Sequence, residues 1–362
     1  MSYKSVWDFG RSGGITNYSV HSIGEYPSKI RPLVFHEIVK RFSDVGDIIL
    51  DPFCGCGTMG VEAKILGRHS INYDINENAV NLTREKLSKL TKEEIEKVYE
   101  YFINELEKEK RNKEVERIDK KIDELKLIIN GITEKELKNT YKSLIEDFEE
   151  IKKKEEASKL RKVQIDKEIA KYKKLKEEII DLETKHISEI GDARTIDYLQ
   201  DLQKISPNKN FFDAVITDIP YASMIKYSDL KDDLSNIEDY DNFINELSIS
   251  FKKMTDVLKK EGYCVIFVAD YRVGASRKIL PIHVDVVNIM RNLGLTLFDT
   301  YIWRYYRSGG FRPFGKKPFQ AMNIHTYILV FHKPDGEELN KKNSEVKYRK
   351  RLIEKMNNNN HN

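Results

Sequence analysis

Two short stretches carry residue types that could do chemistry. One of them, FFDAVITDIPYASMIKY, contains a β-branched apolar run that ends at Asp218 and is followed by Ile219, Pro220 and Tyr221. Proline lacks the N–H that a central strand needs, so we expect the strand to end here. Its end would then present a carboxylate and an exposed aromatic side chain. An ordinary strand-to-loop turn, which Asp and Pro both favour, is the alternative interpretation.

The other stretch lies earlier in the chain and reads IILDPFCGCGTMGVEAKILGRHSINYDINENA. A strand closes on Asp51, a Gly-x-Gly loop follows at Gly55 and Gly57, and a helix begins near Thr58. A second strand closes on Asp74, 23 residues after Asp51. A glycine-rich turn between strand and helix lets a ligand approach the backbone, and an acid after the second strand can bind ribose hydroxyls. A simple tight turn is again the alternative.

The loop lacks the Lys-Ser/Thr ending of a phosphate-binding loop and the full dinucleotide fingerprint. Instead it has an acid at the strand end and the pair Pro52-Phe53 before the glycines. This D-P-F-x-G-x-G-T string resembles the S-adenosylmethionine loop of class I methyltransferases. It looks most like the amino-methylating DNA methyltransferases, which modify cytosine N4 or adenine N6.

The tetrapeptide that begins at Asp218 resembles the catalytic motif of that family, (Asp/Asn/Ser)-Pro-Pro-(Tyr/Phe/Trp). Ile219 stands where the family has its first proline, which leaves the target base unassigned. The resemblance implies that Asp218, Pro220 and Tyr221 are catalytic. Ring-carbon methylation of cytosine is excluded, because it needs a nucleophilic thiolate and no Cys here follows a Pro.

Three further segments resemble parts of the same family. Residues 25–39, EYPSKIRPLVFHEIV, resemble the segment that closes over the methionine end of the cofactor, and residues 191–194, GDAR, resemble the acidic turn at its adenine. Residues 325–334 look like the last core strand. The resemblance implies S-adenosyl-L-methionine as cofactor, no metal, and these cofactor-binding residues: Pro27, Lys29, Asp51, Phe53, Gly55, Gly57, Thr58, Asp74, Asn76, Asp192 and Ala193.

Amino methylation explains why these residue types would be needed. An exocyclic amino nitrogen is a poor nucleophile, because its lone pair is delocalised into the ring. Asp218 and the backbone carbonyl of Ile219, held by Pro220, would accept its N–H groups and favour the developing charge. A base inside a duplex cannot reach such a site, so it must flip out, and Tyr221 would offer a face for stacking.

Elements of alternating type must position these residues. Apolar runs predict strands at 48–50, 70–73, 214–217, 263–268 and 324–331, and amphipathic stretches predict helices at 31–42, 58–67, 77–90, 241–259 and 282–293. Strands that alternate with helices favour a doubly wound, largely parallel α/β sheet. The resemblance implies that this sheet has the Rossmann-like class I methyltransferase fold. We expect this methyltransferase domain to cover 1–90 and 188–336.

The segment 91–187 has a different composition. It holds 25 Lys plus Arg and 26 Asp plus Glu, no Pro, and Gly131 as its single Gly. Apolar residues recur in steps of three and four, the pattern of a heptad seam. Asn130-Gly131 would end one helix, and Thr133-x-x-Glu136 would cap the next. We therefore expect an inserted antiparallel coiled-coil hairpin, which could mediate homodimerisation or read DNA. The tail 337–362 is expected to be disordered.

Composition limits the other possibilities. The net charge of +3 does not indicate a general affinity for nucleic acid. No run of apolar residues approaches the roughly 18 that a transmembrane helix requires. No apolar leader is visible at the start, and three cysteines fit a reducing compartment, so we expect a cytoplasmic protein without membrane contact. Cys54 and Cys56 lack a second ligand pair for zinc.

Target recognition is harder to place. Residues 301–318 interleave aromatic and basic side chains, which suits base stacking and phosphate contact. Residues 8–22 and 222–240 are loop-like segments that could close over DNA. His283 fits a structural histidine better than a ligand or a base.

We therefore expect a site-specific DNA methyltransferase that acts on cytosine N4 or adenine N6 of a flipped base, in a restriction–modification system with a cognate endonuclease. One alternative is an RNA methyltransferase of the tRNA guanine-N2 type. The other is a non-catalytic coiled-coil interaction protein on a degenerate methyltransferase fold.

Overall fold

The computed structural model describes residues 5–8, 18–27, 29–129, 160–221, 225–273, 278–304 and 325–335. The chain divides into two compact units, one made of Met1–Leu90 and Glu183–Asn362 and the other of Thr91–Leu182. In the described residues, no helix combines the length and the apolar character that crossing a membrane requires.

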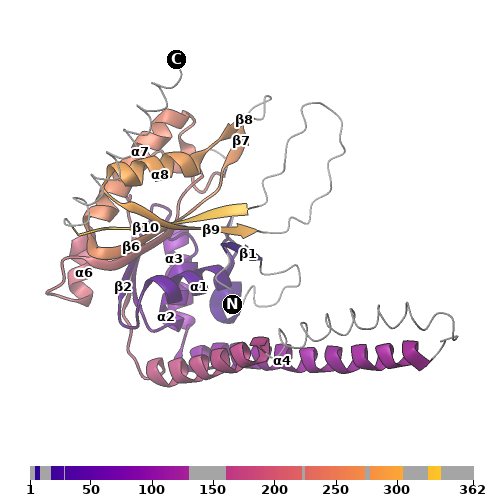
Figure 1. Ribbon diagram of the computed structural model, residues 1–362. Helices are drawn as coiled ribbons and strands as arrows, with labels where there is room; N and C mark the ends of the chain where they lie inside the picture. The colour runs from indigo at the N-terminus through magenta and orange to yellow at the C-terminus, as the bar shows by residue number, and fades with distance from the viewer. Residues whose placement is uncertain are drawn as a thin grey trace, which may run out of the picture. The chain divides into compact units, whose positions relative to one another are not determined.

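The larger unit is built on a mixed eight-stranded sheet with the strand order β1-β9-β10-β6-β5-β2-β3-β4 (Figure 1). Strands β2 to β6 run parallel to one another, and β10 is antiparallel to both of its neighbours. The strands are β1 (Val6–Asp8), β2 (Ile48–Asp51), β3 (His69–Asp74), β4 (His186–Ile190), β5 (Phe212–Asp218), β6 (Leu258–Val268), β9 (Thr296–Arg304) and β10 (His325–His332). A separate two-stranded ribbon joins β7 (Tyr271–Val273) to β8 (Lys278–Leu280).

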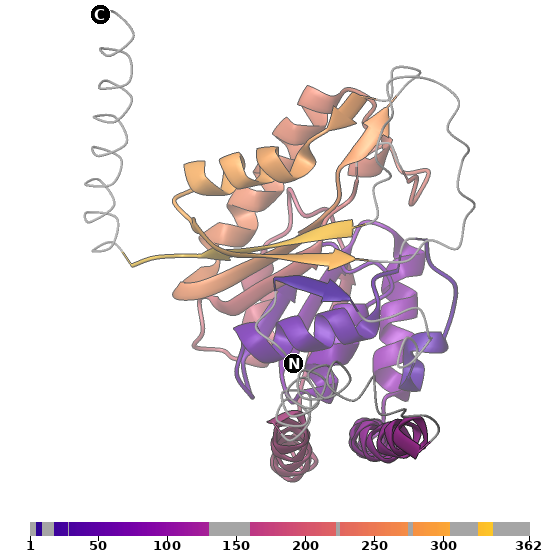
Figure 2. The ribbon, with the colours of Figure 1, turned by 45° about the vertical axis from the view of Figure 1, so that its right-hand side comes forward.

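Helices cover both faces of this sheet (Figures 1 and 2). On one face, Phe35 packs on Phe267 of β6 with ring centroids 4.7 Å apart. On the other face, Tyr198, Phe243 and Ile282 join strand residues in one apolar cluster. The first face carries α1 (Pro32–Phe42), α2 (Thr58–Ile65) and α3 (Glu77–Lys89), and the second carries α6 (Tyr198–Ile205), α7 (Tyr240–Asp256) and α8 (Ile282–Asn292). Two short 3-10 helices are η1 (Ser19–Ser22) and η3 (Leu234–Asn236).

The central strands are buried on both faces, which explains why they are continuous apolar runs in the sequence. All four residues of β2 are buried, and in β5 only Asp218 is partly exposed. The chain builds β3 and β4 on one side of β2 and places β5 and β6 on the other. The order therefore reverses between β2 and β5, and ligands of open α/β sheets bind at the carboxyl ends of strands at such a reversal.

The predicted α/β class is confirmed, and each predicted strand and helix has a counterpart in the structure. Helix α6 and five strands were not predicted: β4 and β9 mix polar with apolar residues, and β1, β7 and β8 have only three residues each. Strand β4 begins at His186, so residues 186–187, which were assigned to the inserted hairpin, belong to the sheet.

The smaller unit contains α4 (Lys92–Ile129) and a second helical stretch at 160–179. Phe102 stacks on Tyr172 with ring centroids 5.3 Å apart. Ion pairs join the two stretches in antiparallel order, namely Lys92–Asp181 at 2.5 Å, Lys176–Glu100 at 3.4 Å and Lys110–Asp166 at 2.7 Å. The predicted turn, the second capping box and the tail 337–362 lie outside the described residues, so the complete coiled-coil hairpin stays a prediction.

Candidate functional site

A cavity opens at the carboxyl ends of β2, β3 and β5, where the strand order reverses. It encloses about 820 Å³ of space, its open mouth included. Its lining comes from the loop after β2, from the ends of β3 and β5, from the turn after β4 and from two outer segments. The lining residues are Tyr26, Lys29, Ile30, Phe35, Asp51–Cys56, Thr58, Asp74, Ile75, Gly191–Ala193, Asp218–Pro220, Tyr227 and Asp232–Leu234.

Asp51 ends β2 at the floor of this cavity and is only 2% exposed. Its Oδ1 accepts a hydrogen bond of 2.6 Å from the hydroxyl of Thr217 and one of 3.2 Å from the backbone N–H of Phe53. Burial raises the pKa of Asp51 to about 7, although these two hydrogen bonds favour the ionised form. The carboxyl group can therefore respond to a cation that enters the cavity.

Asp74 ends β3 and is held by backbone groups. Its Oδ2 accepts from the N–H of Gly55 at 2.8 Å, and its Oδ1 accepts from the N–H of Asn76 at 2.9 Å. Burial raises its pKa to about 6 against the effect of these bonds. A carboxylate fixed in this way at the end of the second strand can accept ribose hydroxyls.

The two glycines of the loop have different reasons to be glycine. Both adopt positive φ angles, +49° at Gly55 and +74° at Gly57. A Cβ on Gly55 would lie 2.9 Å from the ring of Tyr26 in the cavity wall, whereas a Cβ on Gly57 would lie 2.5 Å from Thr83 of α3. Gly57 does not line the cavity. We expected Gly57 to be glycine because a ligand approaches it. The structure gives a different reason, which is the close packing of this position against α3.

The strand end at Asp218 forms the neighbouring wall. The phenol of Tyr221 donates a 2.5 Å hydrogen bond to Oδ1 of Asp218, and burial raises the pKa of Asp218 well above its usual range. Tyr221 is only 4% exposed, so the prediction of an exposed aromatic was wrong. The hydrogen bond to the acid explains the difference, because it draws the phenol inward. Pro220 and Ile219 line the cavity as expected.

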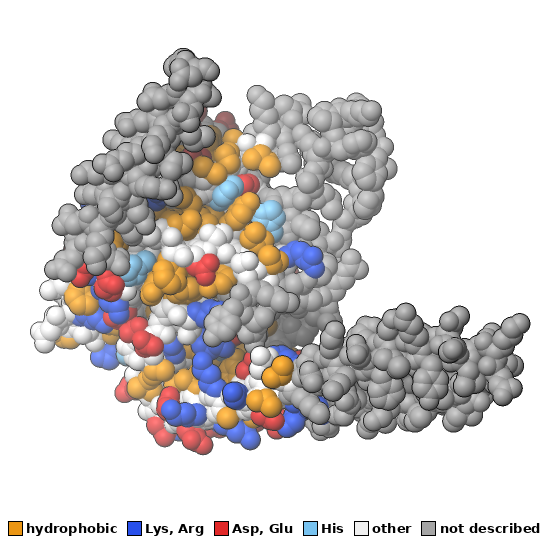
Figure 3. Space-filling model, in the orientation of Figure 1, with side chains coloured by type: hydrophobic (Ala, Val, Ile, Leu, Met, Phe, Trp, Pro, Cys, Tyr) orange, Lys and Arg blue, Asp and Glu red, His pale blue; other side chains and the backbone are white. Residues whose placement is uncertain are grey.

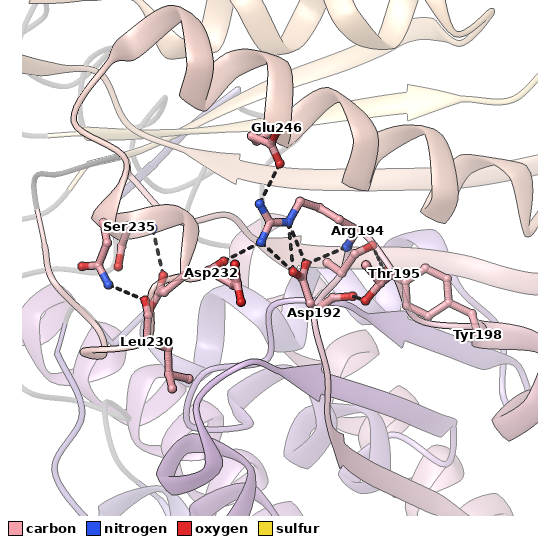
Figure 4. Close-up of polar contacts among 11 residues, drawn as sticks. Asp192, Arg194, Thr195, Tyr198, Leu230, Asp232, Ser235 and Glu246 are labelled. Carbon is pink, nitrogen blue, oxygen red and sulfur yellow. Dashed lines mark hydrogen bonds and ion pairs between the residues drawn. The ribbon is translucent and has the colours of Figure 1, made fainter.

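Arg194 ties the turn after β4 to the outer segments (Figure 4). Its guanidinium donates to both carboxylate oxygens of Asp192, at distances from 2.6 to 3.0 Å, to Glu246 of α7 at 2.6 Å and to the backbone carbonyl of Asp232 at 2.6 Å. Both oxygens of the predicted adenine contact, Asp192, are thus engaged by Arg194. Bidentate pairs of this kind fix geometry as well as charge.

A tyrosine pair covers part of the cavity. Tyr26 and Tyr227 stack with ring centroids 5.9 Å apart and an interplanar angle of 20°. The side chain of Asn76 donates to the backbone carbonyl of Tyr227 at 2.9 Å and caps α3 through a 3.0 Å bond from the N–H of Asn78. The segment after the strand-end motif is therefore fastened to the start of α3.

The structure brings most of the predicted residues to this cavity. Lining positions are taken by Lys29, Asp51, Phe53, Gly55, Thr58, Asp74, Asp192, Ala193, Asp218 and Pro220. Gly57, Asn76 and Tyr221 support the lining from behind, and Pro27 is exposed outside it. Lys29 donates to the backbone carbonyl of His21, and burial lowers its pKa.

Several residues of the site were not predicted. Tyr26 lies in the quoted segment 25–39 and Tyr227 in the loop 222–240, but neither tyrosine was singled out there, and Thr217 is hidden within an apolar strand run. Arg194 stands in the quoted GDAR segment, where its charge next to Asp192 was the available signal.

The acidic lining of the cavity suits a cationic ligand that carries a ribose. Six aspartates and one lysine are present among the described lining residues. S-adenosyl-L-methionine has a positively charged sulfur, an ammonium group and ribose hydroxyls, and the acidic lining and the fixed Asp74 are complementary to these groups.

Comparisons with known proteins point in the same direction. A family model for N6/N4-type DNA methylases matches residues 2–85 and 212–362. The chain is similar to the type II methyltransferase M.MjaII of Methanocaldococcus jannaschii, at 31% identity over 34% of this chain and 24% of the relative. It is also similar to the type II methyltransferase M2.LlaDCHI of Lactococcus lactis subsp. cremoris, at 34% identity over 24% of this chain and 30% of the relative.

The chain thus matches only about a quarter to a third of the length of these curated relatives. Among solved structures, a TehB-like SAM-dependent methyltransferase from Corynebacterium glutamicum has 11% identity over 83% of this chain and 86% of that chain. Its TM-score of 0.35 is too low to bear on function.

Proposed function

Because the chain belongs to the N6/N4 DNA methylase family, we propose that it transfers a methyl group from S-adenosyl-L-methionine to an exocyclic amino group, cytosine N4 or adenine N6, in DNA. The observation that carries the proposal is the placement of Asp218 and Asp51 at the ends of neighbouring strands, in the wall of one acidic cavity. The names of the two curated relatives extend the proposal to a restriction–modification setting.

The cofactor would occupy the part of the cavity over β2 and β3. Asp74 would accept its ribose hydroxyls, Gly55 would let it approach the backbone, and Tyr26 would close over it. When bound, S-adenosyl-L-methionine supplies an electrophilic methyl group on a positively charged sulfur. Asp51 and Asp218 then face that positive charge in a site where burial makes the interaction strong.

Asp218 would orient and deprotonate the target. Its carboxylate accepts an N–H of the amino group, and the backbone carbonyl of Ile219 accepts the other. As the N–C bond forms and the C–S bond breaks, the surplus proton on nitrogen passes to Asp218 and then to solvent. Burial raises the pKa of Asp218, which makes its carboxylate a stronger base than an exposed aspartate. Tyr221 would move from its bond to Asp218 to stack on the base.

Substitution of Asp218 tests this assignment. Asp218→Ala should keep the affinity for S-adenosyl-L-methionine within a few-fold and lower methyl transfer to DNA by about 10² or more, as expected for a positioned base. Asp256→Ala removes an exposed carboxylate of α7 and is the matched control. Near-normal transfer by Asp218→Ala would reduce Asp218 to a turn residue.

The proposal extends to the unit Thr91–Leu182. We assign it a role in self-association or DNA contact, separate from cofactor binding. A chain in which a short Gly/Ser linker replaces 92–182 should still bind S-adenosyl-L-methionine and lose self-association, measured by sedimentation, or DNA affinity. Loss of cofactor binding would show that the unit is required by the core.

A further inference from the structure

Half of the carboxyl edge of the sheet lies beyond the cavity. The cavity covers β2, β3 and β5, whereas β6, β10 and β9 continue the sheet on the far side of Asp218. Asp218 pairs with Phe267 of β6, and Phe267 pairs with Ile328 of β10. Strands are spaced by about 4.8 Å, so Ile328 lies about 10 Å from Asp218, and β10 begins three residues beyond Ile328, at His325. An acceptor that meets a methyl donor held over β2 and β5 must approach from this side.

An aspartate–histidine pair stands at this part of the edge. Asp270 follows the end of β6 and is 7% exposed. Its carboxylate accepts from the backbone N–H of His283 at 3.2 Å, and it lies 2.7 Å from Nδ1 of the same imidazole. A carboxylate partner orients a histidine ring by fixing which nitrogen faces it. Within the described residues, Nε2 of His283 makes no hydrogen bond.

The oriented imidazole belongs to a row of rings. His283 stacks on Tyr327 with ring centroids 4.2 Å apart and an interplanar angle of 15°. His325 meets the other side of the row, with its ring 4.8 Å from Tyr327 and nearly perpendicular to it. Arg304, at the end of β9, is the register partner of His325. We call His283, Tyr327, His325 and Arg304 the ring platform.

The ring platform is accessible. Its three rings are partly exposed and Arg304 is exposed. Histidine, hydrophobic and basic side chains gather beside the ends of β9 and β10 in Figure 3. A histidine that served only to fasten α8 to β6 would need its bonds to Asp270, but it would not need a partly exposed stack with two further rings.

We propose that the ring platform is a contact surface for the DNA strand that carries the target base, a role that rests on the proposed function above. Aromatic and imidazole rings give an unpaired base a stacking surface, and a guanidinium suits a phosphate. Asp270 keeps the His283 ring in place through its contacts with Nδ1 and the backbone N–H. The surface lies where the strand must pass for its base to reach Asp218.

The strand β10 supplies a matched control for the test, because it has a histidine at each end. His325 lies at the carboxyl edge, and His332, which contacts Glu261 at 3.2 Å, lies at the opposite edge. Dissociation constants of a fluorescent DNA duplex with one unpaired nucleotide would be measured on the full chain, in the presence of S-adenosyl-L-homocysteine. His325→Ala and His283→Gln should each weaken binding by about tenfold, as expected for a lost stacking contact. His332→Ala should leave it unchanged.

The salt dependence gives a second readout. Arg304→Gln should lower the slope of log affinity against log salt by about 0.9, the value for one lost phosphate contact. Lys252→Gln on α7 removes an exposed charge at the other edge and should not change the slope. The side chain of His325 makes no hydrogen bond within the described residues, so we expect His325→Ala to keep the fold, which thermal denaturation would confirm.

The outcomes separate the two proposals. Wild-type affinity for the DNA duplex in both His325→Ala and His283→Gln would contradict the proposed role of the ring platform. An equal loss of DNA affinity in His332→Ala would contradict it as well. If the unsubstituted chain transferred no methyl group to any DNA, the proposed function itself would fail, whatever the ring platform binds.

Discussion

The hydroxyl of Thr217 donates a 2.6 Å hydrogen bond to the carboxylate of Asp51, joining the ends of the neighbouring strands β5 and β2. The bond lies where the strand order reverses, one residue before Asp218. It favours the ionised form of Asp51, whose pKa burial would otherwise raise further. The strand that ends in the proposed base thereby helps to set the charge of the proposed cofactor site.

Replacing this hydroxyl should weaken cofactor binding. Thr217→Val keeps the side-chain shape but removes the donor to a buried carboxylate, a hydrogen bond of about 1.5–3 kcal/mol. The affinity for S-adenosyl-L-methionine, measured by calorimetry at pH 7, should therefore fall by about tenfold or more. Thr217→Ser retains the hydroxyl and should bind within a few-fold of the unsubstituted chain. Equal affinities of the Val and Ser variants would contradict this role.

Cofactor affinity should rise with pH. The pKa values of Asp51 and Asp74 are raised to about 7 and about 6, so both carboxyls hold protons in part below these values. A cationic ligand favours the carboxylates, and its binding must therefore release protons at low pH. The affinity for S-adenosyl-L-methionine should increase from pH 5.5 to pH 7.5 and then level off.

The control for this effect is S-adenosyl-L-homocysteine, which lacks the charge on sulfur and should show a weaker pH dependence. In Asp51→Asn the contribution of that group should disappear. The sign for stability is opposite: a raised carboxyl pKa stabilises the free protein most below about pH 4, and this contribution is lost as the pH rises through 7. Parallel pH curves for the two ligands would exclude the acidic cavity as the cause.

Gly57 should matter for folding more than for ligand approach. Gly57→Ala combines a left-handed conformation, which costs about 1–2 kcal/mol, with an overlap against Thr83 that adds about 1–3 kcal/mol. Gly46 has a φ of +85° but nothing within 4 Å of its Cβ position, so Gly46→Ala should show the conformational cost alone. Chemical denaturation of the ligand-free protein measures both. Equal losses of stability would show that α3 yields without cost.

Arg194 should act on cofactor binding through position alone. Arg194→Lys keeps the charge but cannot bridge Asp192, Glu246 and the carbonyl of Asp232 together, so the turn after β4 loses its anchor to the outer segments. We expect about tenfold weaker binding of S-adenosyl-L-methionine, in line with the loss of one charge-assisted bond. Arg84→Lys, at an exposed pair with Glu189, is the control and should have little effect. An unchanged affinity for S-adenosyl-L-methionine in Arg194→Lys would show that the bonds of Arg194 do not position the cofactor site.

Local patterns in the sequence were sufficient to predict the central strands that line the cavity. Continuous apolar runs marked β2 and β5 because these strands are buried on both faces, and an acid at the end of each marked the edge. Strand β4 was missed because it pairs with only one neighbour and its residues are mostly partly exposed. The tyrosine pair, its tie to Asn76 and the bonds of Arg194 to Asp232 and Glu246 could not be foreseen, because their partners lie between 38 and 201 residues apart and depend on the tertiary fold.

The aromatic of the strand-end motif illustrates the same limit. The sequence placed Tyr221 in one motif with Asp218, but it did not predict that the tyrosine would donate a hydrogen bond to this acid. With a raised pKa and a 2.5 Å bond from the phenol, Asp218 draws Tyr221 inward in the ligand-free protein. A spacing pattern can predict which side chains share a site, but not which of them pair before the ligand arrives.

The central claim is amino methylation of DNA, and nucleoside analysis tests it most directly. Purified protein would be incubated with unmethylated DNA and isotopically labelled S-adenosyl-L-methionine, and the DNA would be digested and analysed by mass spectrometry, with Asp218→Ala in parallel. The account predicts label in N4-methylcytosine or N6-methyladenine, and at least about 10² less of it with Asp218→Ala. Label in 5-methylcytosine, no label in any nucleoside of the DNA, or equal label with the Asp218→Ala variant would contradict it.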